Sequence, residues 1–230
     1  MVKLARAVLF FLSTLSIYLV IPLVGWGLGH LAKFFSYPPR LGYAIVVALF
    51  SLAVSIQAYE SVVGIRGGKG EKEKFVFRQH VVRILLIIAM YVTLFFIPLF
   101  DRLDIGVFPG PPCVNWLGVV FSAIGYFLIF LSGLALGRQY SQDVTIQPGH
   151  RLITWGVYRF IRHPRYLGII LLAIGVSLVF RSWIGLIATI VFSAILLFRI
   201  QDEETTMHQE FGVEWEVYRQ RSWRLLPYVY

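Results

Sequence analysis

Residues 159–170 read RFIRHPRYLGII and place three arginines and a histidine directly before a long apolar run. This run, Leu167–Phe198, is too long for one membrane span, because a bilayer core needs about 20 apolar residues in a helix. The run is interrupted at Arg181-Ser182-Trp183. We therefore expect a transmembrane helical hairpin with two short, tilted or partly re-entrant arms.

Four further stretches are long and apolar enough to cross a bilayer as helices: Ala7–Leu28, Leu41–Tyr59, Val81–Phe100 and Val114–Leu136. The composition agrees, since 58% of the residues are hydrophobic and 14% are charged, against about 45–50% and about 25% in soluble domains. We predict an all-α integral membrane protein. It should have about four N-terminal transmembrane helices, a C-terminal transmembrane helical hairpin and an amphipathic C-terminal helix.

The charges of the loops predict the orientation in the membrane. The loop Gly64–His80 carries five basic side chains against two acidic ones, whereas the basic residue of the loop Asp101–Pro112 is Arg102. Cytoplasmic loops are enriched in Lys and Arg, so the first loop should be cytoplasmic and the second should lie outside. The N-terminus and the polar segments Arg138–Arg165 and Arg199–Tyr230 then share the cytoplasmic face, where we expect the two segments to meet.

Several other classes of function are disfavoured by the sequence. The net charge of +9 does not indicate a nucleic-acid partner, because the basic residues lie in short loops beside apolar spans. The segment Gly67–Gly70 lacks the Gly-Lys-Ser/Thr ending of a phosphate-binding loop. The single cysteine, Cys113, excludes an intramolecular disulfide and a thiolate metal cluster. We predict no metal site.

The first polar cluster lies at the start of the hairpin. Pro164 suits the first position of a helix, where its missing N–H would be unpaired anyway. The free N–H groups of a first turn and the helix dipole favour an anion. Arg162, His163 and Tyr166 would add donors there, so we expect a carboxylate or phosphate site. The flanking arginines are more typical of interfacial anchors.

The second polar cluster, Arg199–Glu204, ends the hairpin. Arg199 and Glu203 are four residues apart, so they share a helical face and can pair. That pair leaves Glu204 unexplained, and the adjacent acids could bind hydroxyl groups or a cation. Apolar side chains then recur at spacings of four, four and three, at Met207, Phe211, Trp215 and Tyr218. They predict one amphipathic helix packed on the interface or on the core.

Three motifs in order carry a resemblance to a known family. They are GHRLITWGVYRFIRHPRYLG at Gly149–Gly168, Arg199-x-x-x-Glu203-Glu204, and Phe211-Gly212-x-x-Trp215-x-x-Tyr218. Together they resemble the isoprenylcysteine carboxyl methyltransferase and phospholipid methyltransferase family, over about Gly137 to Pro227. Trp155 and Val157 depart from that family's usual small residue and proline, which affects only the shape of the loop.

The resemblance implies a membrane enzyme that transfers a methyl group from S-adenosyl-L-methionine to a lipophilic acceptor. It implies catalytic roles for Arg199, which would steer the acceptor, and for Glu203. The implied cofactor-binding residues are Tyr158, Arg162, His163, Pro164, Tyr166, Leu167, Gly168, Glu203 and Glu204. The anion site at Pro164 would suit the methionine carboxylate, and the two acids would suit ribose hydroxyls or the ammonium group. His163 is also a candidate base for an amine or thiol acceptor.

Within that family we expect O-methylation of an isoprenylcysteine carboxylate, with phospholipid or small-thiol methylation as alternatives. An alternative of another class is an NADPH-dependent membrane sterol reductase, which shares an Arg-His-Pro-x-Tyr segment and an ending similar to Pro227–Tyr230. Glu203-Glu204 and Phe211-Gly212 favour methyl transfer.

The same resemblance suggests a division of labour along the chain. Residues 1–112 would form a scaffold that gives the acceptor access, and residues 113–230 would form the methyltransferase core. The expected partners are the lipid membrane and a lipophilic acceptor, in a prokaryotic plasma membrane. The spacing of Gly125, Gly133 and Gly137 supports close helix packing within the chain or in a homo-oligomer.

Overall fold

The computed structural model describes residues 2–60, 77–137 and 151–229. In chain order its helices are α1 (Val2–Leu15), α2 (Ile21–Trp26), α3 (Leu31–Phe35), α4 (Pro38–Tyr59), α5 (Phe77–Leu103), α6 (Pro112–Leu136), α7 (Pro164–Val179), α8 (Trp183–Phe211) and α9 (Val213–Gln220). A π-helical turn, Ser16–Val20, joins α1 to α2, and short 3₁₀ turns occupy Leu28–His30 and Gly156–Arg159.

Five helical segments within the described ranges are long and apolar enough to span a membrane: Lys3–Trp26, Pro38–Tyr59, Ile84–Leu103, Pro112–Leu136 and Trp183–Phe211. The sixth apolar helix, α7, has only 16 residues. The predicted all-α membrane protein, with four N-terminal spans and a C-terminal hairpin, is confirmed. Pro164 stands at the beginning of α7, as expected from its missing N–H.

The return arm of the hairpin differs from the prediction. We expected a short arm that ends near Phe198, but α8 is 29 residues long and continues to Phe211. Its apolar character stops before its hydrogen bonding does. Arg199, Glu203 and Glu204 therefore lie on the same rigid helix as the span, because a helix can leave the bilayer without ending.

The predicted single helix beneath the aromatic stripe is also wrong. Gly212 has a φ of 49°, which ends α8 and begins α9. Glycine adopts this left-handed conformation without a Cβ penalty, so the chain can turn there. Phe211 lies in α8, whereas Trp215 and Tyr218 lie in α9, where both are buried. The amphipathic C-terminal helix exists but has only eight residues.

Helices α6 and α7 meet through two pairs of glycines. A Cβ on Gly118 would lie 2.7 Å from the carbonyl oxygen of Gly175, and a Cβ on Gly125 would lie 2.6 Å from that of Gly168. On each helix the two glycines are seven residues apart, so they lie on one face. The two backbones therefore contact each other twice along that face. The predicted close packing at Gly125 is confirmed within the chain.

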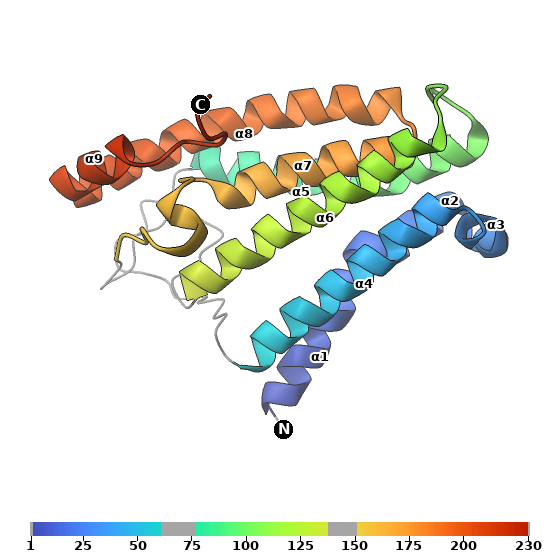
Figure 1. Cartoon of the computed structure of the whole chain (residues 1–230), viewed down its shortest axis with the longest axis horizontal. Coiled ribbons are helices and arrows are strands. Elements are labelled where there is room, and N and C mark those ends of the chain that lie inside the picture. Colours follow the sequence, from blue (N-terminus) through green and yellow to red (C-terminus); the bar gives the residue numbers. More distant parts are fainter. Residues whose placement is uncertain (1, 61–76, 138–150, 230) are drawn as a thin grey trace.

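A buried ion cluster joins three elements at the end of the molecule opposite to α9 (Figure 1). Asp101, near the end of α5, accepts from Arg40 Nη2 at 2.7 Å and from Arg181 Nη2 at 3.1 Å. Arg40 lies near the start of α4, and Arg181 lies in the turn between α7 and α8. The cluster therefore fixes the turn of the hairpin against the N-terminal helices.

The start of α7, the end of α8, α9 and the C-terminus gather at the other end (Figure 1). The main hydrophobic core includes Tyr43 of α4, Leu94 of α5, Tyr126 of α6 and Val176 of α7. It thus crosses the predicted boundary at residues 112 and 113, and the division of labour stays a prediction. The orientation signals in Gly64–His80 and Arg138–Arg165 fall partly outside the described residues, and Gly67–Gly70 falls wholly outside.

Candidate active site

The C-terminal segment pairs with the residues that precede α7. Arg162 N donates to Trp223 O at 2.7 Å, His163 N donates to Arg224 O at 3.1 Å, and Trp223 N donates to Phe160 O at 2.9 Å. Ile161 and Trp223 form a parallel bridge. These backbone bonds place the C-terminal segment directly beside the Arg162-His163-Pro164 motif, although about sixty residues separate the two in sequence.

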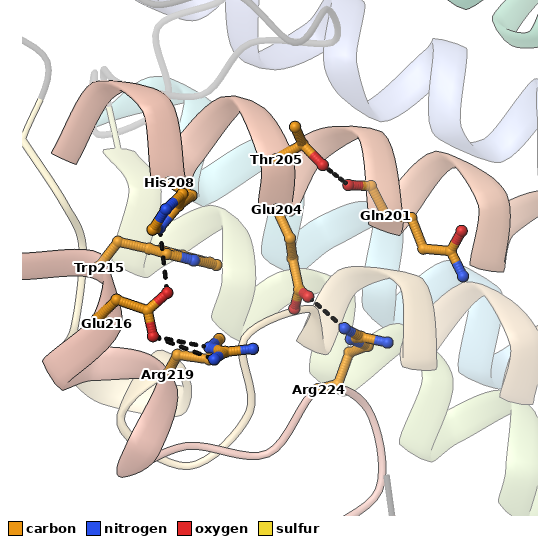
Figure 2. A pocket seen from close by; sticks show the side chains of 8 residues that line it. All are labelled: Gln201, Glu204, Thr205, His208, Trp215, Glu216, Arg219 and Arg224. Atoms are coloured by element: carbon orange, nitrogen blue, oxygen red, sulfur yellow. Dashed lines mark hydrogen bonds and ion pairs between the residues drawn. The ribbon is translucent and has the colours of Figure 1, made fainter. Parts of the chain in front are cut away.

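Glu204 is the centre of one group of contacts. Its Oε1 accepts from Arg162 Nε at 2.9 Å and lies 3.3 Å from His163 Nε2, while its Oε2 accepts from Arg224 Nη2 at 2.6 Å. Glu204 is only 7% exposed. These contacts replace the hydrogen bonds to water that the carboxylate loses when it is buried. Figure 2 shows Glu204 on α8 pointing toward Arg224.

Glu203 is the centre of a second group. Tyr166 donates its hydroxyl proton to Glu203 Oε1 and accepts from Arg199 Nε at 2.9 Å. Arg199 Nε also lies 3.3 Å from Glu203 Oε1, so the predicted i,i+4 pair is confirmed. His163 Nδ1 lies 3.6 Å from Glu203 Oε2. His163 therefore sits between the two adjacent carboxylates of α8.

The five charged side chains of these two groups leave a net positive charge. Arg162, Arg199 and Arg224 carry three positive charges against the two of Glu203 and Glu204. The groups are mostly buried, with Arg162 side chain 8% and Arg199 side chain 11% exposed. Such a constellation can hold hydroxyl or ammonium groups on its carboxylates and an anionic group near its arginines.

Two tyrosines close the site beside α9. Tyr218 donates its hydroxyl proton to the carbonyl oxygen of Tyr158 at 2.7 Å. Burial raises the pKa of Tyr218 to about 12, and burial likewise raises the pKa of Tyr158. Both hydroxyls are therefore neutral donors at physiological pH. Tyr158 thus lies beside α9 through its bond with Tyr218, and its role toward a cofactor stays a prediction.

Not every predicted site residue presents its side chain to the site. Leu167 belongs to a small core with Ile161, Ile200 and Leu225. Gly168 lies against the backbone of α6, where a Cβ would be 2.7 Å from Gly125 O. Both residues support the first turn of α7 by packing.

Arg162 differs from our expectation. We predicted that it would offer donors to an anion at the start of α7. Instead its Nε bonds Glu204 and its Nη1 donates to the carbonyl oxygens of Arg219, at 3.1 Å, and of Ser222. The guanidinium therefore ties the C-terminal segment to α8.

Sequence reasoning missed Arg224. Charge balance does not reveal it, because Arg199 and Arg162, both already candidates, match the charges of Glu203 and Glu204. Arg219, Arg221 and Arg224 lie close together near the C-terminus, so the sequence alone does not single out Arg224.

An open pocket of about 430 Å³ lies beside this cluster. Its lining comes from α8, α9 and the C-terminal segment: Gln201, Glu204, Thr205, His208, Trp215, Glu216, Arg219 and Arg224 (Figure 2). Glu216 of α9 bridges to α8, because its Oε1 lies 3.1 Å from His208 Nδ1. Its Oε2 lies 3.1 Å from Arg219 Nη2 within α9. The pocket reaches the cluster through Glu204.

Comparison of the sequence with known proteins identifies a family that it resembles. The model of the isoprenylcysteine carboxyl methyltransferase (ICMT) family matches residues 116–209. That range contains α7, most of α6 and α8, and both carboxylates of the candidate site.

Individual relatives agree with the family match. The chain is 34% identical over 119 residues to "Probable protein-S-isoprenylcysteine O-methyltransferase" of Oryza sativa subsp. indica, covering 50% of this chain and 62% of the relative. It is 30% identical over 132 residues to "Protein-S-isoprenylcysteine O-methyltransferase B" of Arabidopsis thaliana, covering 55% and 67%. A shorter similarity, 32% over 92 residues, links it to a Delta(14)-sterol reductase of Mus musculus, covering 39% and 22%. The chain thus spans less than two thirds of the length of the rice relative.

Proposed function

Because this chain belongs to the isoprenylcysteine carboxyl methyltransferase family, we propose that it transfers a methyl group from S-adenosyl-L-methionine to a lipophilic acceptor in the membrane. The preferred acceptor is the carboxylate of an isoprenylcysteine. The observation that carries the proposal is His163 held between Glu203 and Glu204 at the start of α7. This polar cluster lies at the end of apolar helices, where a charged cofactor can meet an acceptor dissolved in lipid.

The donor set suits the cofactor. Carboxylates accept hydrogen bonds from ribose hydroxyls and from an ammonium group, and the net positive charge of the cluster accommodates a carboxylate. His163, Tyr166, Glu203 and Glu204 would hold the cofactor, with Tyr158 at the edge. S-adenosyl-L-methionine, when bound, supplies an electrophilic methyl group on a sulfonium.

Packing residues prepare the site for that ligand. Pro164 begins α7 with no unpaired N–H of its own. Leu167 and Gly168 then press the first turn of α7 against the core and against α6. Because the backbone of this turn is fixed, the neighbouring side chains need little reorganisation when a ligand binds.

Arg199 is the residue we assign to the acceptor. Its Nε is oriented by Tyr166 and by Glu203, so the guanidinium has a defined position next to the cofactor cluster. A cation there complements an acceptor carboxylate. A carboxylate needs no general base, so the main contributions of the protein would be orientation of the reactants and exclusion of water. An amine or thiol acceptor would require a base, for which His163 is the nearest candidate.

The topology completes the proposal. With the positive loops inside, the N-terminus and the candidate site face the cytoplasm of a prokaryotic plasma membrane. Residues 1–112 would guide the acceptor, and residues 113–230 would bind the cofactor. A homo-oligomer stays an expectation, because the described glycine contacts lie within one chain.

Calorimetric titration of the detergent-purified protein with S-adenosylhomocysteine, and in parallel with NADPH, tests the cofactor. Binding of S-adenosylhomocysteine alone is expected, and His163→Ala and Glu203→Ala should each weaken it while the protein stays folded. The similarity to the sterol reductase makes NADPH the informative comparison. Binding of NADPH alone, or unchanged affinity in both variants, would refute the assignment.

Transfer of labelled methyl to an S-farnesylated cysteine derivative tests the acceptor. The matched control is the same compound with its carboxylate replaced by a carboxamide, which cannot form the ester. Methylation of the acid and not of the amide is expected. Methylation of a phosphatidylethanolamine or of a small thiol instead would move the protein to the corresponding alternative activity.

A further inference from the structure

The C-terminal segment Ser222–Leu225 lies beside the candidate site and contributes a side chain to it. Its backbone pairs with Phe160–His163 through three hydrogen bonds. Arg162 reinforces the pairing, since its Nη1 donates to Ser222 O. Leu225 is 6% exposed and packs with Leu167 of α7. Arg224 lies between the paired Trp223 and the packed Leu225, so its backbone position is defined on both sides.

Arg224 and His163 contact the two oxygens of the same carboxylate, that of Glu204. Arg224 Nη2 bonds Glu204 Oε2 at 2.6 Å, and His163 Nε2 lies 3.3 Å from the other oxygen of the same group. Arg162 holds that other oxygen as well, at 2.9 Å. With one arginine on each oxygen, the carboxylate cannot rotate without breaking a charged hydrogen bond. Its orientation toward the imidazole is thereby set.

We propose that Arg224 is a positioning residue of the cofactor site: through Glu204 it fixes the imidazole of His163 between the two carboxylates of α8. This inference rests on the proposed methyl transfer for its functional consequence. The positioning itself depends only on the contacts of Arg224 and His163 with Glu204. Figure 2 shows the Arg224 and Glu204 side chains meeting at the pocket wall.

The test compares Arg224→Gln with a matched control at Arg221, which directly precedes the segment. Arg221→Gln removes an arginine that is exposed and three residues away. Three quantities are measured on the full chain in detergent: the Kd for S-adenosylhomocysteine, the ¹⁵N resonances of the histidine side chains, and the Tm. The resonances of His163 are identified as those that His163→Gln removes. The resonances report the position of the imidazole independently of activity.

Arg224→Gln should raise the Kd about tenfold, near the lower end of what loss of a charged hydrogen bond causes. It should also shift the His163 resonances. Arg224→Lys, which restores a cation, should recover most of both effects, and Arg221→Gln should change neither. In a Glu204→Gln background, Arg224→Gln should add little to the Kd, because the shared link is already broken.

The outcomes separate this inference from the proposed function. Unchanged His163 resonances and Kd in Arg224→Gln, or equal changes in Arg221→Gln, would overturn the positioning role. If the wild type does not bind S-adenosylhomocysteine but Arg224→Gln still shifts the His163 resonances, the positioning role stands and the proposed cofactor is refuted. Should Arg224→Gln fail to fold, Arg224→Met, which keeps much of the aliphatic packing, takes its place with the same expectations.

Discussion

Gly125→Ala should separate helices α6 and α7, because the added methyl group has no space. Its Cβ would lie 2.6 Å from Gly168 O and 2.8 Å from Leu172 N. Both are backbone atoms, which cannot rotate away as a side chain can. The oxygen contact is about 0.8 Å shorter than the 3.4 Å at which ordinary van der Waals contact begins. The two helices must therefore shift as bodies.

The expected loss of stability follows from this overlap. Overpacking in a dense core costs about 1–3 kcal/mol; with two backbone contacts under 3.0 Å we take the upper part, about 2–3 kcal/mol, of which the better helix propensity of alanine offsets about 1 kcal/mol. A net loss of roughly 1–2 kcal/mol lowers the Tm of a chain of this size by about 2–8 °C. Thermal unfolding in detergent, followed by tryptophan fluorescence, measures the shift. Because Gly168 lies in the first turns of α7, affinity for S-adenosylhomocysteine should fall as well.

Gly133→Ala is the matched control, since it makes the same substitution on the same helix. There the new Cβ would meet the side-chain amide of Gln57 at 3.4 Å, and that flexible side chain can move. We expect a Tm within about 2 °C of the wild type, or above it. Equal effects of the two substitutions, or a Tm for Gly125→Ala at or above that of the wild type, would refute the argument from backbone contact.

Three other perturbations address separate parts of the molecule. Asp101→Asn should destabilise the protein by about 3–5 kcal/mol, because it leaves Arg40 and Arg181 without their buried partner; a loss under 1 kcal/mol in thermal unfolding would contradict the ion cluster's role. Arg199→Ala should reduce the rate of methyl transfer more than the affinity for S-adenosylhomocysteine, and an equal loss in calorimetry and turnover would assign Arg199 to the cofactor. Burial raises the pKa of Tyr218 from 10.0 to about 12, so its contribution is complete below pH 10 and is lost as the pH rises through 12. Tyr218→Phe should accordingly lose about 1 kcal/mol at pH 8 with the bond to Tyr158, and should show a weaker decline of stability between pH 10 and 12; an unchanged decline would exclude Tyr218 as its source.

The candidate site was only partly predictable. The motifs identified His163, Tyr166 and Glu203, which the structure brings together, and the spacing of Arg199 and Glu203 predicted their pair. The partners of Glu204 were not predictable in the same way. Arg224 is twenty residues away on a different element, and no periodic spacing relates residues of two elements. The direction of Arg162 likewise depends on carbonyl oxygens of the C-terminal segment, which carry no sequence signal.

The sequence by itself determined the membrane spans, the start of α7 at Pro164 and the motif residues His163, Tyr166, Arg199, Glu203 and Glu204 of the cluster. These follow from local properties: apolar length, the missing N–H of proline, and motif order. The tertiary structure decided that α8 runs on through Glu204, that the chain turns at Gly212, and that Arg224 completes the cluster. A helix ends where its hydrogen bonding ends and not where its hydrophobicity does. Charged residues that are distant in sequence pair only if the fold brings them together, so only the tertiary structure determines which arginine reaches Glu204.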